Sequence, residues 1–444
     1  MHSLSECRLE SNNNVKITFD GGDLSSDGGL LLLKDFLHQF GVPELLNRVL
    51  MPKDLRRAPI HRNGELLLQA IVQVIAGYFS DDSADILRKD PVFKEILGKK
   101  FLASQPTMSR FYSRLGLGDG PAKQLESIEK TLRKRVYSVE MPDKVVFDMD
   151  TTLFQTYGHQ LEAAFNAHYQ AIGYHPFVCY DGITGDLLLA VLRGGADYCC
   201  KDAASFMEPL LKEYCEQYPG IKRYARGDSG FATPELYDLF EKYSTTYVIR
   251  LKENPTLVRL AGDIISKVRA QMNDDWISPR AEYGEFRYQA GSWDHDRRVV
   301  VKVQKPSESF TLQCMFIVTN DEDSAPKEVI DHYCARGNME NFIKESKNGF
   351  DFKTVSSLFM AENAARLQMH AIAYNIFNWM KRLVFPEKMR GSQVDTVRLH
   401  LFKTAVRLVH HGRKQIFRMA TSCMCKDDFL YTLNAIQRLE PQIE

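Results

Sequence analysis

The chain has little of several features that mark particular classes of protein. Its 444 residues contain no apolar run long enough to span a bilayer, and its N-terminus lacks the order of residues typical of a signal peptide. Its nine cysteines form an odd, irregularly spaced set, which argues against a disulfide framework. These absences indicate a protein of the reducing cytosol, with no membrane among its partners.

An excess of charge of one sign is also missing, since 57 basic residues balance 57 acidic ones. A global positive charge is the simplest way to attract a polyanion, so a nucleic-acid partner requires local clusters of basic residues. Two cysteine pairs, Cys199-Cys200 and Cys423-Met424-Cys425, lack the second ligand pair of a zinc site. We interpret these cysteines as thiols that hold no metal.

The chain does have 44% hydrophobic residues, enough for two or three packed domains. Residues 1–15 are polar, and we expect them to fray. Helical periodicity then extends from about 23 to 140, with N-cap oxygens at 25–27 before the leucines of 30–33. This part of the sequence predicts a helical N-terminal region.

A short apolar strand that ends in Asp148-Met149-Asp150 begins a different pattern. A hairpin, a helix, a strand that ends at Asp228, a second helix and a final strand are predicted to follow. The predicted ranges are 145–147, 176–180 with 187–192, 201–217, 221–225, 234–243 and 246–251. The order of three strands, helix, strand, helix, strand predicts an α/β fold with a ribonuclease H-like core, a mixed sheet flanked by helices.

A strand-rich block over 276–320 interrupts this core, with strands predicted at 286–289, 298–303 and 311–318. Helical periodicity returns over 325–384 and again over 390–418. The last segment contains a single acid, Asp395, among many basic residues. The basic residues are Arg390, Arg398, Lys403, Arg407, Arg413, Lys414 and Arg418. A basic helix is usually a solvated face, but such a helix can also contact phosphates, and this is how we interpret it here.

Three acidic residues lie where a metal site can assemble. Asp150 ends the first core strand, Asp228 follows the fourth, and Glu340 lies on a helix after the insertion. Acids at the ends of adjacent strands converge on one sheet edge, although a single Asp there is more often a turn residue or a helix cap. Carboxylates that bridge two divalent ions can stabilise both the attacking and the leaving oxygen of a phosphodiester, and magnesium prefers such oxygen ligands.

The third acid belongs to the most specific motif in the chain. Tyr333, Arg336, Glu340 and Lys347 have the spacing Y-x2-R-x3-E-x6-K, which puts them on one face of a single predicted helix. Arginine and lysine beside a carboxylate ligand can bind phosphates, and tyrosine can donate a hydrogen bond or stack. An amphipathic helix with ordinary ion pairs is the alternative interpretation.

This motif, with 150–152 and 226–231, resembles the insertion-sequence transposases of the transposase DDE domain group 1 family. The resemblance covers nearly the whole chain and extends to 25–29, 77–82, 103–110, 165–166, 192–195 and 398–407. It implies a catalytic core with a β-rich insertion, a two-ion Mg2+ site in which Mn2+ can substitute, and action on double-stranded DNA at the inverted-repeat ends. It also implies cut-and-paste movement by a homodimeric synaptic complex at the bacterial nucleoid.

The resemblance further implies roles for single residues and domains. Asp150, Asp228 and Glu340 match the metal-binding catalytic triad. The residues that match those holding transposon-end DNA are Tyr333, Arg336 and Lys347. The predicted domains are a helical N-terminal DNA-binding region (1–140), the first part of the core (141–255), a β-rich insertion (256–324), the completion of the core (325–385) and a basic helical C-terminal region (386–444).

Two further DNA contacts are expected. In relatives that cleave through a DNA hairpin, a tryptophan of the insertion holds a flipped base, because an aromatic face offsets part of the unstacking cost. Trp293 lies in this insertion and Trp276 lies near its start, although a strand tryptophan is more often part of a core. The helix that opens at Ser104 resembles the start of a recognition helix, or else a scaffold helix. Its candidate DNA contacts are Thr107, Ser109 and Arg110.

Two other functions remain open at this level. The segment 145–152 also fits the first motif of haloacid dehalogenase-like phosphatases, with Asp148 as a covalent phosphate acceptor. That motif normally opens its domain, and position 232, where the later acidic motif needs a second Asp, is Ala232. In the transposase interpretation Asp148 instead supports Asp150 from the same face of its strand. The other alternative is a transposase-derived protein that binds DNA without cleaving it.

Overall fold

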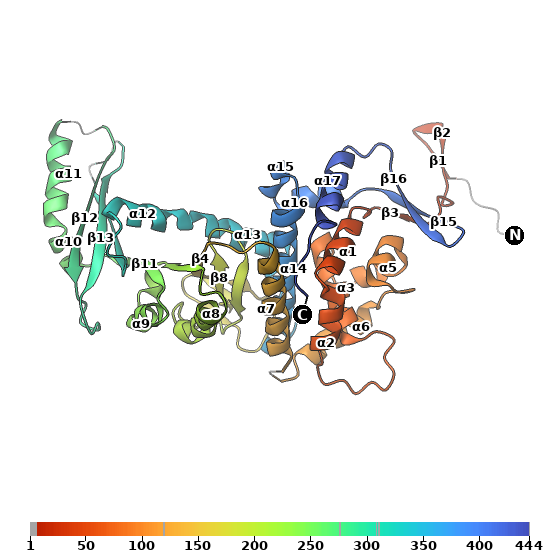
Figure 1. Ribbon diagram of the computed structural model, residues 1–444, viewed down its shortest axis with the longest axis horizontal. Coiled ribbons are helices and arrows are strands. Elements are labelled where there is room, and N and C mark those ends of the chain that lie inside the picture. The colour runs from red at the N-terminus through yellow and green to blue at the C-terminus, as the bar shows by residue number, and fades with distance from the viewer. Residues whose placement is uncertain (1–6, 119, 275–276, 308, 310, 444) are drawn as a thin grey trace. The chain divides into compact units, whose positions relative to one another are not determined.

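The computed structural model describes residues 7–118, 120–274, 277–307, 309 and 311–443. The chain divides into two compact units, whose helices and strands are labelled in Figure 1. The terminal unit contains Met1–Val139 and Trp379–Glu444, and the central unit contains Glu140–Asn378. In the described part of the chain, no helix combines the length and the apolar character needed to cross a membrane.

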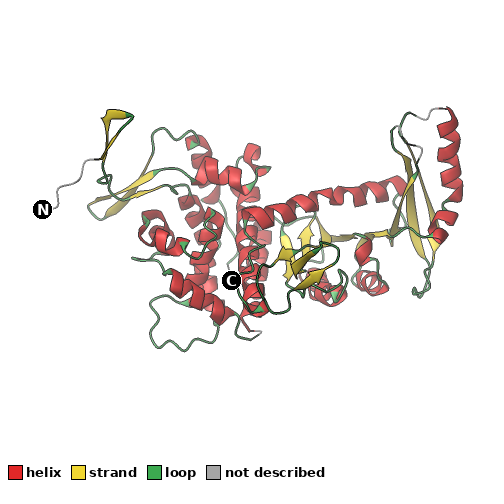
Figure 2. Cartoon of the chain, turned by 180° about the vertical axis from the view of Figure 1, so that it is seen from behind, coloured by secondary structure: helices red, strands yellow, loops and turns green. Residues whose placement is uncertain are grey.

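The central unit is built on an eight-stranded mixed sheet with the order β12-β13-β14-β11-β10-β4-β8-β9. Figure 2 draws the strands in yellow and the helices in red. The strands are β4 (Lys144–Thr151), β8 (Phe177–Asp181), β9 (Leu187–Val191), β10 (Lys222–Gly227), β11 (Thr246–Leu251), β12 (Arg280–Tyr288), β13 (Arg297–Lys305) and β14 (Gln313–Thr319). Strand β10 runs parallel to β4 and β11, and the other neighbours are antiparallel. This mixed sheet confirms the predicted α/β class, and its first strands have the predicted order.

Helices cover both faces of the core strands, which explains their near-continuous apolar runs. Phe147 on β4 packs edge-to-face on Tyr214 of α8 (Ala203–Gln217), with 5.2 Å between ring centroids. Tyr180 on β8 meets Tyr374 of α14 (Met360–Val384) in the same way at 5.9 Å. Asn375 of α14 also hydrogen-bonds both backbone groups of Leu187 at 2.8 Å, which fixes the β8–β9 hairpin.

The remaining elements of the central unit include a small second sheet. Its strands, in the order β5-β7-β6, are β5 (Phe154–Gln155), β6 (Ala164–Asn166) and β7 (Ala171–Tyr174). The other helices are η2 (Ser229–Phe231), α9 (Pro234–Lys242), α10 (Pro255–Leu260), α11 (Gly262–Asp274), α12 (Pro326–Cys334), η3 (Ala335–Gly337) and α13 (Asn338–Gly349).

The strands of the predicted insertion extend the core sheet, because β14 pairs with the core strand β11. Helices α10 and α11, which precede these strands, were not predicted from the sequence. The buried positions Ile265 and Val268 of α11 are three residues apart, so its apolar stripe is too narrow to stand out. Helix α12 lies against the extension through an apolar cluster made of Val248, Val300, Ile317, Val329, Ile330 and Tyr333.

The terminal unit is mainly helical. Its helices are α1 (Leu30–Gln39), α2 (Val42–Val49), α3 (Asn63–Ala76), α4 (Ser83–Ile86), η1 (Leu87–Lys89), α5 (Pro91–Leu97), α6 (Gln105–Leu115), α7 (Gly120–Val139), α15 (Glu387–Arg390), α16 (Val394–Val397), the π-helical turn η4 (Arg398–Phe402) and α17 (Lys426–Ile436). Its strands are β1 (Cys7–Leu9), β2 (Asn12–Ile17), β3 (Leu24–Ser25), β15 (Val406–His411) and β16 (Lys414–Met419). The expectation of a frayed 1–15 was wrong for the described residues from 7 onward, because β1 and β2 pair as a hairpin.

The sequence suggested that Asp27 caps a helix, but its side chain does not cap α1. It is 1% exposed and accepts hydrogen bonds from Tyr78 and from Lys403 Nζ, at 2.8 and 2.5 Å. The neighbouring Gly29 donates its N–H to Phe402 O at 3.1 Å, and a side chain there would collide with Leu401 O. The 25–29 motif therefore joins the start of α1 to the C-terminal part of the same unit.

The prediction of a continuous basic helix over 390–418 was wrong. Short helical turns are followed by the β15–β16 hairpin, in which His411 pairs with Lys414 around a two-residue turn. Gly412 in this turn has φ +62°, which lies in the left-handed region that glycine adopts most readily, and β15 ends just before it. Arg398 is buried and binds the carbonyls of Val74 and Ile75 at the end of α3, so it supports the unit rather than DNA.

Candidate active site

Two of the predicted acids lie at the ends of neighbouring parallel strands. The register pairs Arg226 of β10 with Asp148 of β4, and Asp228 and Asp150 each follow two residues later. Burial raises the pKa of Asp150, the guanidinium of Arg336 opposes this shift, and the charge of Asp228 adds to it. The structure thus brings both carboxylates to one edge of the sheet.

Arg336 is the counter-charge of this pair. Its Nη2 lies 3.0 Å from Asp150 Oδ2 and donates to Met149 O at 2.9 Å. Its Nε is buried and has no hydrogen-bond partner among the described residues. The site therefore retains one unsatisfied guanidinium donor beside its carboxylates.

The Y-R-E-K residues do not share a single helix. Tyr333 lies in the last turn of α12, Arg336 lies in the 3₁₀ turn η3, and Glu340 and Lys347 lie on α13. Tyr333 is 8% exposed and packs in the apolar cluster, and its hydroxyl interacts with Arg250. The break in the helix separates a buried anchor, Tyr333, from the residues that follow it.

The structure does not complete the predicted triad. Glu340 is exposed on the first turn of α13. Across the residues that the structure describes, no three His, Cys, Asp or Glu side chains lie close enough together to hold a metal ion. Asp150 and Asp228 therefore provide two carboxylates whose oxygens suit a divalent cation.

Asp148 has a structural partner. Its carboxylate is fully buried and accepts bidentate hydrogen bonds from Arg226, whose Nε and Nη2 lie 2.5 and 2.6 Å away. Arg226 also donates to His332 O at 2.9 Å, which ties β10 to α12. Gly182 fits against this pair only because it lacks a side chain. A carboxylate held in this way is not accessible as the nucleophile of a phosphatase, which removes that alternative.

His332 is expected to make stability depend on pH. Burial, with the charges of Arg226 and Lys144, lowers its pKa from 6.5 to about 4. The unfolded chain binds a proton below pH 6.5 and the folded chain does not, so stability falls between pH 6.5 and about 4, by at most about 3 kcal/mol and by less after solvent screening. Urea denaturation at pH 7.5 and 5 should show a smaller difference for His332→Gln than for the wild type. The exposed His159→Gln serves as control, and equal pH dependence in all three proteins would contradict the assignment.

A cavity lies near the carboxylates, and no feature of the sequence predicted it. Its volume is about 580 Å³, and Tyr157, Tyr169, Lys347 and Lys353 contribute to its lining. The hydroxyl of Tyr169 donates to Thr151 O at 3.2 Å, and burial together with the charges of Asp150 and Asp228 raises the pKa of Tyr169 to about 12. No sequence pattern marked Tyr169, because it lies in the turn between β6 and β7, and these strands are too short to predict.

Trp293 does not offer a free aromatic face. It is 7% exposed and packs edge-on against Tyr237 and Tyr288, with ring centroids 5.5 and 5.3 Å apart. The guanidinium of Arg297 lies 5.6 Å from the same ring. The expectation that Trp293 stacks on a flipped base does not fit this core position, and Trp276 lies outside the described residues.

The candidate recognition helix is α6 in the terminal unit. Ser109 and Arg110 are exposed on it, whereas Met108 and Phe111 are buried. The hydroxyl of Thr107 bonds to that of Ser104 at 3.1 Å within the first turn. Alternating exposure of this kind suits either a recognition helix or a scaffold helix, so the DNA contacts of α6 remain predictions.

Carboxylates at adjacent strand ends of a mixed α/β sheet, with an arginine paired to one of them, define a candidate site for phosphoryl transfer. The chain belongs to the transposase DDE domain group 1 family, whose family model matches residues 7–441. Its function is that of a DNA transposase, and DDE transposases generally use divalent metal ions.

Comparison with solved structures finds similarity to a piggyBac transposase, in a cryo-EM structure of its synaptic complex with hairpin DNA. The two chains are 11% identical, the TM-score is 0.40, and the match covers 84% of this chain and 80% of that chain. Comparison with curated proteins gave no match.

Proposed function

We propose that this transposase cleaves phosphodiester bonds at the inverted-repeat ends of an insertion sequence and joins the freed 3′-hydroxyl to target DNA, in a reaction that requires Mg2+ or Mn2+. The observation that carries the proposal is the convergence of Asp150 and Asp228 on one edge of the sheet, with Arg336 paired to Asp150. Partly buried carboxylates that repel each other bind a divalent cation favourably, because the cation removes the repulsion.

In this proposal Asp150 and Asp228 hold the metal, and Glu340 joins them when α13 shifts on binding DNA. A bound divalent ion supplies charge stabilisation on the phosphate oxygens and lowers the pKa of water. Arg336 has a separate role, since its unsatisfied Nε is placed to donate to a phosphate oxygen once DNA is present. Its ion pair with Asp150 orients this donor beforehand.

The cavity beside Tyr169 gives the DNA strand a path away from the site. Lys347 and Lys353 contribute two cations to its lining, and Tyr157, which is 90% exposed, offers an aromatic surface. Burial and the neighbouring Lys353 lower the pKa of Lys347, as expected where two cations face a space that can receive anionic phosphates. We propose that the backbone next to the cleaved bond lies here, while α6 contacts the repeat in a homodimeric complex.

Lys353→Ala is expected to weaken DNA binding by ~3–10-fold at low salt and to reduce the salt dependence of binding by about one counterion. Fluorescence anisotropy over a series of salt concentrations measures both quantities. Lys212→Ala, which removes an exposed lysine paired with Glu216 on α8, is the matched control and should bind like the wild type. An unchanged salt slope for Lys353→Ala would exclude the cavity from the DNA path.

The experiment that tests the proposed function uses end-labelled duplexes that carry the terminal repeat, with Mg2+ or with EDTA. Cleavage at the repeat end that needs Mg2+ and is lost in Glu340→Ala, while DNA binding survives, would support the proposal. A protein that shifts the labelled DNA without nicking it would be the catalytically silent binder. Equal cleavage by wild type and Glu340→Ala would remove Glu340 from the triad.

A further inference from the structure

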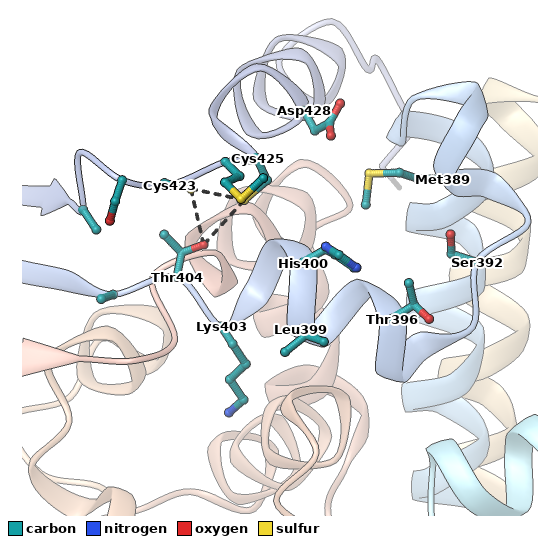
Figure 3. A pocket seen from close by; sticks show the side chains of 14 residues that line it. Met389, Ser392, Thr396, Leu399, His400, Lys403, Thr404, Cys423, Cys425 and Asp428 are labelled. Atoms are coloured by element: carbon teal, nitrogen blue, oxygen red, sulfur yellow. Dashed lines mark hydrogen bonds between the residues drawn. The ribbon is translucent and has the colours of Figure 1, made fainter.

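Two cysteines of the terminal unit lie next to each other in the lining of a second cavity (Figure 3). Cys423 Sγ and Cys425 Sγ are 3.2 Å apart, and each lies 3.8 Å from Thr404 Oγ1. Figure 3 shows the three side chains pointing toward one another. The cavity has a volume of about 540 Å³, so small molecules can approach the thiols.

The fold places this pair at the junction between β16 and α17. The N–H of Cys423 donates to Ala420 O at 3.1 Å, and Cys425 O accepts from the N–H of Phe429 at 2.8 Å in the first turn of α17. Met424 between them is fully exposed, so the flanking side chains turn to the same side. The backbone therefore holds the two thiols together before any bond joins them.

We propose that Cys423 and Cys425 form a dithiol site that low-molecular-weight disulfides oxidise reversibly to an intramolecular disulfide. The Cys423 thiolate attacks one sulfur of the oxidant and displaces the first thiolate, which leaves a mixed disulfide on Cys423. Cys425 then loses its proton, attacks the Cys423 sulfur and displaces the second thiolate. The two cysteines lose two electrons and two protons in total, and the oxidant becomes two thiols.

The surroundings of the two thiols decide which one attacks the oxidant and which one resolves the mixed disulfide. Burial opposes ionisation of Cys423, but hydrogen bonds from Cys425 and Thr404 leave its pKa below that of an ordinary cysteine. Burial raises the pKa of Cys425. Cys423 is therefore the attacking thiol and Cys425 the resolving thiol, because the thiolate is the nucleophile. Only an oxidising environment would close the pair, and reducing conditions would open it.

The other neighbouring pair, Cys199 and Cys200, provides an internal control. Cys199 Sγ lies 3.6 Å from Gly230 O, and burial raises the pKa of both thiols. Trypsin cuts after Arg193 and Lys201, and also after Arg418 and Lys426, so each pair falls in one peptide. One digest thus compares two neighbouring pairs with different surroundings.

The test incubates the full chain with mixtures of oxidised and reduced glutathione, quenches with acid, alkylates with N-ethylmaleimide and analyses tryptic peptides by mass spectrometry. Peptide 419–426 should escape alkylation and have a mass lower by two hydrogens than the reduced, unalkylated peptide. Its disulfide yield should be at least ~10-fold above that of peptide 194–201. Dithiothreitol should reverse the change. In the Cys425→Ser variant the reaction should stop at the mixed disulfide between glutathione and Cys423.

Two results would overturn the proposal. One is alkylation of both Cys423 and Cys425 at every glutathione ratio. The other is accumulation of glutathione on either cysteine of the wild type without an internal bond. Both readouts come from the wild-type chain, so they hold even where the Cys425→Ser variant fails to fold.

Discussion

Asp150→Asn is expected to lower the rate of DNA cleavage by at least ~1,000-fold, because the substitution removes a proposed metal ligand while keeping the side-chain volume. DNA affinity should stay the same or rise, since a negative charge disappears from the site and Arg336 loses its carboxylate partner. Rates of cleavage under single-turnover conditions, measured alongside binding by anisotropy, separate the two effects. A loss of rate with retained affinity assigns Asp150 to the chemistry rather than to DNA binding.

The matched control is Asp331→Asn, which removes an exposed acid paired with Lys327 on α12. This variant changes the net charge by the same amount and should cleave at the wild-type rate. Asp228→Asn should behave like Asp150→Asn, because both acids lie at the same sheet edge. Cleavage by Asp150→Asn within ~10-fold of the control would show that the metal, if required, is held elsewhere.

Arg226→Met is expected to give the largest loss of stability, about 3–5 kcal/mol, because it leaves the carboxylate of Asp148 buried without its partner. It also removes the hydrogen bond from β10 to His332 O. Equilibrium urea denaturation of the full chain measures the change. The double variant Asp148→Leu with Arg226→Met should be more stable than Arg226→Met alone, because no unpaired charge remains.

Arg287→Met is the control for a surface ion pair. Arg287 lies 2.8 Å from Glu322 with both side chains about half exposed, so its loss should cost at most about 1 kcal/mol. If Arg226→Met costs no more than Arg287→Met, the buried pair does not hold β4, β10 and α12 together. In that case the positions of Asp150 and Asp228 would depend on other contacts.

The sequence determined the class of fold and the two acids of the sheet edge. The apolar runs around Asp150 and Asp228 have strand length and alternate with amphipathic helices, and local periodicity of this kind reports burial directly. The predicted order of the core strands and helices in 144–251 is the observed one for this reason, whereas the short strands β5, β6 and β7 between them were not predicted. The family also followed from local motifs, because single residues at fixed spacing carry them.

Only the tertiary structure decided what the charged and aromatic residues contact. Arg398 and Lys403 look like members of a basic helix, yet their partners are Val74, Ile75 and Asp27, more than 300 positions away in the chain. Trp293 likewise lies in a core because it packs against Tyr237, which belongs to a separate segment of the chain. A side chain's partners depend on elements distant in sequence, and periodicity carries no information about them. The cavity beside Tyr169 and the Cys423–Cys425 pair with Thr404 likewise exist only where separate segments meet.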